Sequence, residues 1–342
     1  MTRITGSIRT LVWTVAVALA AVVASERVYW YWGGIDVEQL GVLASFYGVA
    51  VIVAMAALAA SPGSGPRRAV LGGAVFALVV EGIITPVIYE DGPLPLLYLM
   101  FVGWHGLLAF VGFVYAIRRW ALERRSLRLA AGAAVTGIGW GLWALASAVP
   151  DRETAEEIAA DGGGSADVLD PSSFGVYAAW TGLALLVAHV VADRFWPRVG
   201  WRLSKSGRVA AALAVVWLTA TLVVPAVPWA PIKLLALALV LRSLLRRTAS
   251  PAGSDTVIDE LAGRCHLPSL LGLALLPVTA AGTYAVLWPL RESTAFEAVF
   301  WSLIGAQVFI GVGALIWAVR RPRNNASESD DVGRLPVRNT AS

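Results

Sequence analysis

The sequence predicts an all-α fold, a polytopic integral membrane helical bundle of about ten transmembrane helices with both termini cytoplasmic. The first observation is composition. The chain has 342 residues, of which 58% are hydrophobic and 15% charged, whereas a soluble domain is about 25% charged. The second observation is that apolar runs of about 17–23 residues, the length that crosses a bilayer, recur along the whole chain. These runs are expected to be helices because lipid offers backbone polar groups no other partners.

Basic residues predict how the helices are oriented. With ten crossings and the N-terminus inside, the inner segments contain 23 of the 27 Lys and Arg residues. The remaining four are Arg27, Arg152 and Arg291 in outer segments and Lys233 at the outer end of the eighth helix. Cytoplasmic loops are enriched in Lys and Arg, so both termini are placed in the cytoplasm. This distribution accounts for the net charge of +4 without a nucleic-acid partner.

One transmembrane domain is expected over 1–320, and the polar, charged tail 321–342 is expected to be disordered in the cytoplasm. Each span follows an apolar run, and the ten spans are 11–27, 40–60, 69–89, 96–117, 129–149, 174–192, 208–224, 230–246, 267–290 and 296–319. The first run also has the basic start and apolar core of a cleaved signal peptide. We favour a retained helix because polytopic proteins seldom need a separate signal. Ten helices also fit an inverted repeat of five and five, on helix count alone.

Two segments between the spans have a distinctive composition. The segment 25–39 contains four consecutive aromatic residues, namely Tyr29, Trp30, Tyr31 and Trp32. Tyr and Trp are enriched at membrane interfaces, so we interpret these residues as an aromatic belt, with a lid over a pocket as the alternative. The segment 150–173 is the longest outer loop, is acidic and rich in Gly, and is expected to be mobile.

Local signals predict how several helices pack, break or begin. Gly137 and Gly141 lie four residues apart, a spacing that lets another helix approach closely, and we expect that helix to belong to the same chain. Pro277 is expected to kink its helix. In the polar loop before that helix, Ser254 is expected to cap a short helix over 255–261.

A proline-broken hairpin is predicted at 209–241. This stretch contains a single charge, Lys233, and has basic residues on both flanks. Like charges at both ends imply an even number of crossings. The three prolines that break the stretch are Pro225, Pro228 and Pro231. Each arm is short for a full span, so a re-entrant hairpin buried in protein is the alternative.

Two ionisable residues inside the membrane define the candidate site. Glu81 and His105 lie in consecutive spans, eight or nine residues from the acidic turn that joins them. At ~1.5 Å rise per residue they share a depth of ~12–14 Å. Ionisable residues at such a depth are costly and are functional-site hypotheses by default. Thr85 lies one turn above Glu81, and Glu90 and Asp91 lie at the mouth of the site.

Antiparallel neighbours at equal depth can contact each other if both face inward. Glu81 and His105 would then share a proton and change state near neutral pH. A proton-coupled carrier or a buried acid–base site needs such a pair. Pro86 frees a backbone carbonyl near Glu81. The alternative is a polar pair that fixes how two helices pack, worth ~1–2 kcal/mol.

No metal and no cofactor are expected. Cys265 is the single cysteine, which excludes an intramolecular disulfide and a cysteine metal cluster. His105 and His189 differ in depth, which argues against haem between them, and we interpret His189 as an interfacial anchor. Cys265 and His266 alone do not make a metal site. The sequence contains no phosphate-binding loop, dinucleotide fingerprint, HExxH, nucleophile elbow or paired Asp-rich prenyl-diphosphate motif.

Three functions fit these features, and the sequence does not identify a substrate. A small-molecule carrier or permease, with Glu81 and His105 as a proton-coupling pair, is favoured. An integral-membrane enzyme acting on a lipid or isoprenoid would use the same pair as acid and base, with Glu90 and Asp91 near the outer headgroups. A non-catalytic assembly protein would require a protein partner. The preference for Arg over Lys and the richness in Ala indicate a GC-rich prokaryote and hence its plasma membrane.

Overall fold

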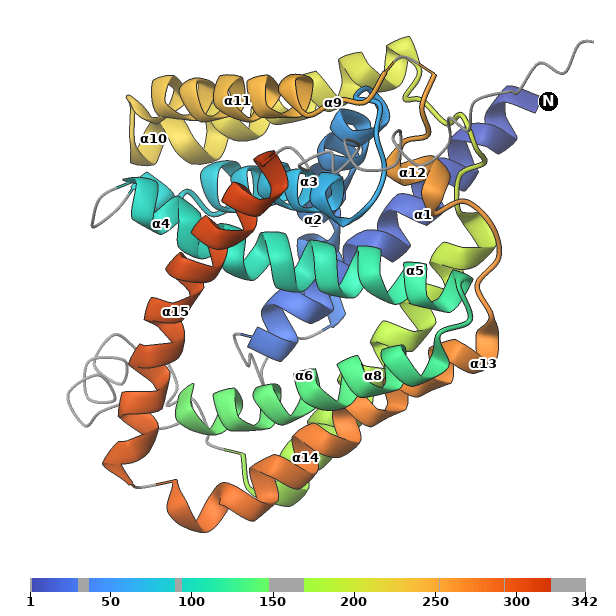
Figure 1. Cartoon of the computed structure of the whole chain (residues 1–342). Coiled ribbons are helices and arrows are strands. Elements are labelled where there is room, and N and C mark those ends of the chain that lie inside the picture. The colour runs from blue at the N-terminus through green and yellow to red at the C-terminus, as the bar shows by residue number, and fades with distance from the viewer. Residues whose placement is uncertain are drawn as a thin grey trace, which may run out of the picture.

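The fold is helical throughout the part of the chain that the structure describes. The computed structural model describes residues 2–29, 37–89, 94–147, 169–251, 253–291 and 293–320. Every regular element in these ranges is a helix (Figure 1). Eight of the helices are long and apolar enough to cross a membrane. The expected class, an all-α membrane protein, is confirmed.

The helices follow the expected spans closely. In the first half they are α1 (Thr2–Val22), the π-helix η1 (Val23–Tyr29), α2 (Val37–Ala59), α3 (Pro66–Val79), the π-helix η2 (Val80–Ile84), the 3₁₀ turn η3 (Val87–Tyr89), α4 (Leu94–Phe101), the π-helix η4 (Val102–Ala116), α5 (Ile117–Leu122) and α6 (Ser126–Ser147). In the second half they are α8 (Pro171–Phe195), α9 (Lys205–Leu218), the π-helix η5 (Thr219–Val223), α10 (Val224–Ala226), α11 (Ala230–Arg247), α12 (Val257–Glu260), α13 (Leu267–Leu270), the 3₁₀ turns η6 (Leu271–Ala274) and η7 (Trp288–Leu290) around α14 (Leu275–Leu287), and α15 (Thr294–Val319). Five long helices are each assembled from consecutive segments: α1 with η1, α3 with η2, α4 with η4 and α5, α9 with η5 and α10, and α13 with η6, α14 and η7.

Two of the ten expected spans are helical but are not among the eight membrane-length helices. The expected span 69–89 corresponds to α3 and η2, which contain Arg67, Arg68 and Glu81. The expected span 230–246 corresponds to α11, which contains Lys233 and three arginines. Both helices are short for the charge they carry, because the first stops at Ile84 and α11 has only 18 residues.

The helices pack around a centre formed by α1, α2, α3 and η4. The α3 helix lies between α2 and η4, and α1 lies between α2 and α8. On the other side, α14 packs against α6 and α8, and α15 crosses α4 and η4 (Figure 1). The expected close approach at Gly137 and Gly141 is confirmed, and its partner is α14. An added Cβ would lie 2.3 Å from the Leu276 carbonyl oxygen at Gly137 and 2.4 Å from that of Ala280 at Gly141.

The third expected span ends five residues earlier than predicted. Thr85 precedes Pro86 and adopts φ −122° and ψ 88°, so the helix stops at Ile84 and not at residue 89. The residue before a proline is disfavoured in the helical region because of a clash with the proline ring. The first helix differs in the other direction, because η1 continues through Tyr29, past the expected end at residue 27.

The expected cap at Ser254 is wrong. The short helix of this loop is α12, and its cap is Thr256, whose side chain accepts from the Asp259 N–H. Asp259 accepts in return from the Thr256 N–H at 3.0 Å, which completes a capping box. Pro277 lies in the first turn of α14, directly after η6, where a missing N–H is tolerated.

The proline-broken hairpin is present, and its arms are surface helices. Pro225 lies in α10 and Pro231 in the first turn of α11, with Pro228 in the turn between them. Only 11% of the apolar stretch within 205–223 is buried inside the structure. A re-entrant hairpin would have to be buried in protein, so this exposure argues against that alternative.

Several expectations fall on residues outside the described ranges. These are the aromatic residues Trp30, Tyr31 and Trp32, the site residues Glu90 and Asp91, most of the loop 150–173, and the tail 321–342.

Cys265 offers a pH-dependent test of the loop between α12 and α13. Burial raises the pKa of the Cys265 thiol to about 12, although Arg118 Nη1 lies 3.3 Å from the sulfur and opposes the rise. Only the thiolate reacts with alkylating reagents. We therefore expect slow modification by iodoacetamide at pH 7–8 in mild detergent, with a rate that rises about tenfold per pH unit. Mass spectrometry of the intact protein measures this rate, and the chain denatured in SDS is the control. Equal rates in the folded and denatured chains at pH 8 would contradict the assignment.

Candidate functional site

Glu81 and His105 contact each other in the interior of the bundle. Glu81 belongs to η2 and His105 to η4, and the Nε2 atom of His105 meets Oε1 of Glu81. The His105 side chain is 1% exposed and that of Glu81 is 6% exposed. The structure thus brings together the two residues that the sequence placed at one depth.

The other edge of the imidazole meets residues from α2 and η1. Ser25 Oγ lies 2.7 Å from His105 Nδ1, and the Tyr47 hydroxyl donates to Ser25 Oγ at 3.0 Å. Tyr47 also donates to Oε1 of Glu26, and Ser25 Oγ lies 3.2 Å from that same oxygen. We call these five residues, Glu81, His105, Ser25, Tyr47 and Glu26, the polar cluster. Its contacts run from one carboxylate to another through an imidazole and two hydroxyl groups.

Aromatic rings enclose the imidazole. The Trp104 ring stacks on His105 with centroids 4.4 Å apart and planes 15° apart, and the Phe101 ring lies 6.1 Å away. The Phe76 ring packs against Tyr47 at 5.8 Å. These rings fix the plane of the imidazole and keep bulk water from it. Trp104 is therefore part of the wall around the imidazole.

The backbones of α3 and η4 touch beside the cluster. A Cβ on Gly73 would lie 2.5 Å from the Gly106 carbonyl oxygen, and a Cβ on Gly106 would lie 3.0 Å from that of Gly73. Gly103 makes a similar approach to Gln307 on α15, at 2.6 Å. Small residues at such crossings let membrane helices approach closely. His105, which lies between Gly103 and Gly106 in the sequence, is thereby held where it reaches Glu81.

Three of the helices that supply the cluster are π-helical where they do so. Ser25 and Glu26 lie in η1, Glu81 in η2 and His105 in η4. π-helical turns are rare and are frequently found at functional sites. The turn at Glu81 closes with the Thr85 N–H donating to the Val80 carbonyl oxygen at 2.8 Å. The carbonyl that Pro86 frees is that of Gly82, and it accepts from the Tyr89 hydroxyl at 3.1 Å.

The cluster accommodates more than one placement of its protons. When Nε2 carries the proton and faces Glu81, the Ser25 hydroxyl donates to Nδ1. When Nδ1 carries it, the imidazole donates to Ser25 Oγ, and the Ser25 hydroxyl turns toward Glu26. A hydroxyl group is both donor and acceptor, so both placements leave the Ser25–His105 contact satisfied. Chains of this kind polarise one another in a low-dielectric interior.

Sequence reasoning found two of the five cluster residues. The sequence places Ser25 and Glu26 in the segment 25–39, which follows the first apolar run. Tyr47 was one apolar-run residue among many. Glu26 could have been found from its position, because its carboxylate lies within one helical turn of the end of an apolar run. Thr85 is exposed, and among the described hydrogen bonds none joins its side chain to the cluster.

The remaining candidates do not form a second site of this kind. His189 is buried on α8, 7% exposed, so it is not the interfacial anchor that the sequence suggested. The loop that contains Cys265 is held to α8, because the Cys265 N–H donates to Asp193 Oδ1 at 2.8 Å. Among the described residues, no group of three or more His, Cys, Asp and Glu side chains is arranged to hold a metal ion.

The fold and the site together define a class: an all-α membrane protein with a buried, protonatable cluster in its interior. Comparison with known proteins finds no match, whether to a family model, to a curated protein or to a solved structure.

Proposed function

We propose that this chain is a proton-coupled small-molecule carrier in a prokaryotic plasma membrane. One observation supports the proposal: two carboxylates, Glu81 and Glu26, are joined by an unbroken series of contacts through His105, Ser25 and Tyr47. Glu26 is partly exposed and the other four members are buried. A proton accepted at Glu26 therefore has a hydrogen-bonded route to the Glu81–His105 pair.

A purely structural role would explain less of the cluster. Polar contacts between membrane helices contribute about 0.6–2 kcal/mol each. A charged carboxylate in the middle of a membrane helix costs about 2.5–3.5 kcal/mol. One Gln–Ser pair would fix the helix crossing without that cost, whereas two carboxylates and an imidazole are needed only if protons move.

The charge distribution supports the topology of this carrier. We propose that α3–η2 and α11 also cross the membrane, which gives ten crossings with both termini cytoplasmic. Their arginines then lie at helix ends on the basic side. Arg68 of α3 is bonded there, donating to the Leu245 carbonyl oxygen at 2.9 Å and to Thr248 Oγ1 at 2.6 Å. These bonds join the inner ends of α3 and α11.

A proton-flux assay tests the proposal. The purified chain is reconstituted in liposomes that contain a pH-sensitive dye, and a panel of sugars, amino acids, organic acids and organic cations is applied with and without a pH gradient. We expect one solute class to drive proton uptake. Ser25→Ala breaks the series of contacts and is expected to lower this flux about 100-fold, the scale of a lost proton-transfer group.

Ser269→Ala is the matched control for this assay. Ser269 is also fully buried, and its Oγ lies 2.9 Å from His266 Nδ1 and 2.7 Å from Ser126 Oγ. Both substitutions remove a buried serine that contacts a histidine, but Ser269 lies outside the polar cluster. Equal fluxes for the two variants, or no solute-driven proton movement in the wild type, would contradict the proposal.

A membrane enzyme is the second candidate, and one feature favours it. Ser25, His105 and Glu81 follow the order hydroxyl, imidazole and carboxylate, which activates a nucleophile in acyl transfer. In this case Ser25 would attack a lipid ester. The complete burial of Ser25 ranks this candidate below the carrier. Labelling of Ser25 by a fluorophosphonate, absent in His105→Gln, would favour the enzyme.

A further inference from the structure

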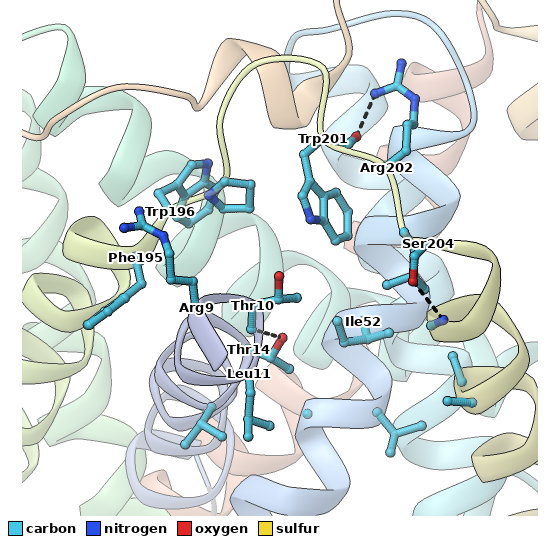
Figure 2. Close-up of a pocket in the computed structure, with 18 of the residues that line it drawn as sticks. Arg9, Thr10, Leu11, Thr14, Ile52, Phe195, Trp196, Trp201, Arg202 and Ser204 are labelled. Carbon is cyan, nitrogen blue, oxygen red and sulfur yellow. Dashed lines mark hydrogen bonds between the residues drawn. The ribbon is translucent and has the colours of Figure 1, made fainter. Parts of the chain in front are cut away.

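A second, separate feature of the molecule is a large groove between α1, α2 and α9, under the segment that joins α8 to α9 (Figure 2). Its volume is about 1540 Å³, which exceeds the roughly 300–1,000 Å³ of sites for drug-sized ligands. Neither Glu81 nor His105 lines it. The groove is therefore not the mouth of the polar cluster.

The rim of the groove is basic. Arg9 comes from the start of α1, and Arg198 and Arg202 come from the segment above α9; all three are exposed. The described lining residues include no acidic side chain. One carboxylate adjoins the rim: Asp259 Oδ1 accepts from the Gly200 N–H at 2.6 Å, which anchors the joining segment, and its charge interacts with Arg202. The rim thus carries three cations around the groove, with Arg9 and Arg202 on opposite sides of it in Figure 2.

Below the rim the lining becomes apolar. Leu11 and Val15 of α1, Val49 and Ile52 of α2, and Ala214 of α9 form the lower walls. Leu11 is 63% exposed, so this part of the groove opens sideways to lipid. From Ser204 to Ala214 the wall descends about 15 Å at the helical rise, which is about half the hydrocarbon thickness of a bilayer.

Aromatic residues mark the level at which the lining changes. Figure 2 shows Trp196 and Trp201 on the joining segment, above the α1 residues. Trp13 of α1 packs edge-on against both, with ring centroids 5.6 Å from Trp196 and 5.4 Å from Trp201. The Arg9 guanidinium lies 5.9 Å from the Phe195 ring centroid. Indole rings prefer the headgroup level of a membrane.

We infer that this groove binds an anionic glycerophospholipid of the leaflet at the basic end of the bundle. The three arginines hold the phosphate headgroup, and one acyl chain descends along the apolar walls. Charge complementarity selects an anionic headgroup, because the rim is cationic and the described lining is free of acids. The depth, volume and lateral opening select a lipid over a water-soluble phosphate.

Native mass spectrometry in a non-ionic detergent tests this inference. Delipidated protein is titrated with phosphatidylglycerol and, separately, with phosphatidylcholine of the same acyl chains. We expect selective retention of phosphatidylglycerol. The triple variant Arg9→Gln, Arg198→Gln and Arg202→Gln is expected to bind it about 100-fold more weakly, from about fivefold per cation.

The matched control removes three arginines from elsewhere. Arg242→Gln, Arg246→Gln and Arg247→Gln lie on α11, are exposed and do not line the groove. This variant loses the same charge and is expected to retain phosphatidylglycerol. Equal weakening in the two triple variants, or equal retention of the two lipids by the wild type, would overturn the inference.

A second pair of variants tests the apolar wall without changing charge. Ala214 lines the groove, whereas Ala212 on the same helix is exposed and does not line it. Ala214→Phe fills the acyl-chain path and is expected to lower lipid retention at least tenfold, while Ala212→Phe leaves it unchanged. Excess glycerol 1-phosphate should fail to displace the lipid. Displacement at concentrations similar to those of the lipid would identify a soluble phosphate site and overturn the assignment to lipid.

Discussion

Glu81→Gln is expected to abolish solute-driven proton flux while the bundle stays folded. The Gln side chain has the same shape as protonated Glu, and its amide oxygen can still face His105 Nε2. It cannot bind or release a proton, so the Glu81–His105 pair loses one of its two states. We expect flux to fall at least 100-fold, the scale of a lost acid–base group.

Thermal unfolding from pH 5 to pH 8 distinguishes this loss from misfolding. A transported solute at 100 times its dissociation constant should stabilise the wild type by ~2.7 kcal/mol, to an extent that depends on pH. Glu81→Gln should lose the pH dependence. Glu81→Ala, in contrast, leaves the buried imidazole without a carboxylate and should cost about 1–3 kcal/mol at every pH.

Glu123→Gln is the matched control for Glu81→Gln. Glu123 accepts from Arg119 Nε at 2.9 Å at the basic end of the bundle, and this bond lowers its pKa. It therefore stays ionised between pH 5 and pH 8, and its removal should change stability by about 0–1 kcal/mol. Proton flux that survives in Glu81→Gln at the level of this control would exclude Glu81 from coupling. Uniform destabilisation without loss of flux would assign the pair to helix packing.

The fold class and the shared depth of Glu81 and His105 could be predicted. Each depends only on the number of residues in an apolar run or between a residue and a turn. An apolar run of given length implies a helix in lipid. Two residues equally distant from one turn lie at one depth because the helical rise is fixed. Glu81 and His105 followed from these two rules, without knowledge of which helices are neighbours.

Ser25, Glu26 and Tyr47 could not be predicted in the same way. Their contacts depend on α1 and η1 lying beside η4 and on α2 lying beside α1 and α3, and hydropathy does not determine the order of helices in a bundle. They depend as well on the rotation of each helix about its axis, which nearly uniform apolar faces leave undetermined. π-helical turns at η1, η2 and η4 change that rotation again.

The packing of Arg118 could not be predicted from the sequence either. The sequence treated Arg118 as one of many signals of the cytoplasmic face. In the structure it is 2% exposed, donates to the Leu261 and Gly263 carbonyl oxygens at 2.8 Å each, and lies 3.7 Å above the Trp196 ring. The charge count assigns Arg118 to the cytoplasmic face but does not predict that this arginine organises the loops around it.

Gly73→Ala is expected to destabilise the protein although alanine is the better helix former. In an exposed helix interior, replacing Gly by Ala gains roughly 1 kcal/mol. At Gly73 the new Cβ would lie 2.5 Å from the Gly106 carbonyl oxygen, a backbone atom that cannot turn away. The α3 helix must therefore move from η4, at a cost of about 1–3 kcal/mol for overpacking. The clash outweighs the gain in propensity, so the unfolding temperature should fall.

The same displacement should separate Glu81 from His105, because Gly106 follows His105 directly and Gly73 lies on the helix that leads to Glu81. We expect Gly73→Ala to lose proton flux as well as stability. Gly139→Ala on α6 is the control, because an added Cβ there meets nothing within 4 Å; it should be neutral or slightly stabilising and keep its flux. Differential scanning fluorimetry and the liposome assay measure the two effects. If Gly73→Ala is destabilised but transports normally, the helix contact and the polar cluster are independent, and the cluster's position does not rest on this crossing.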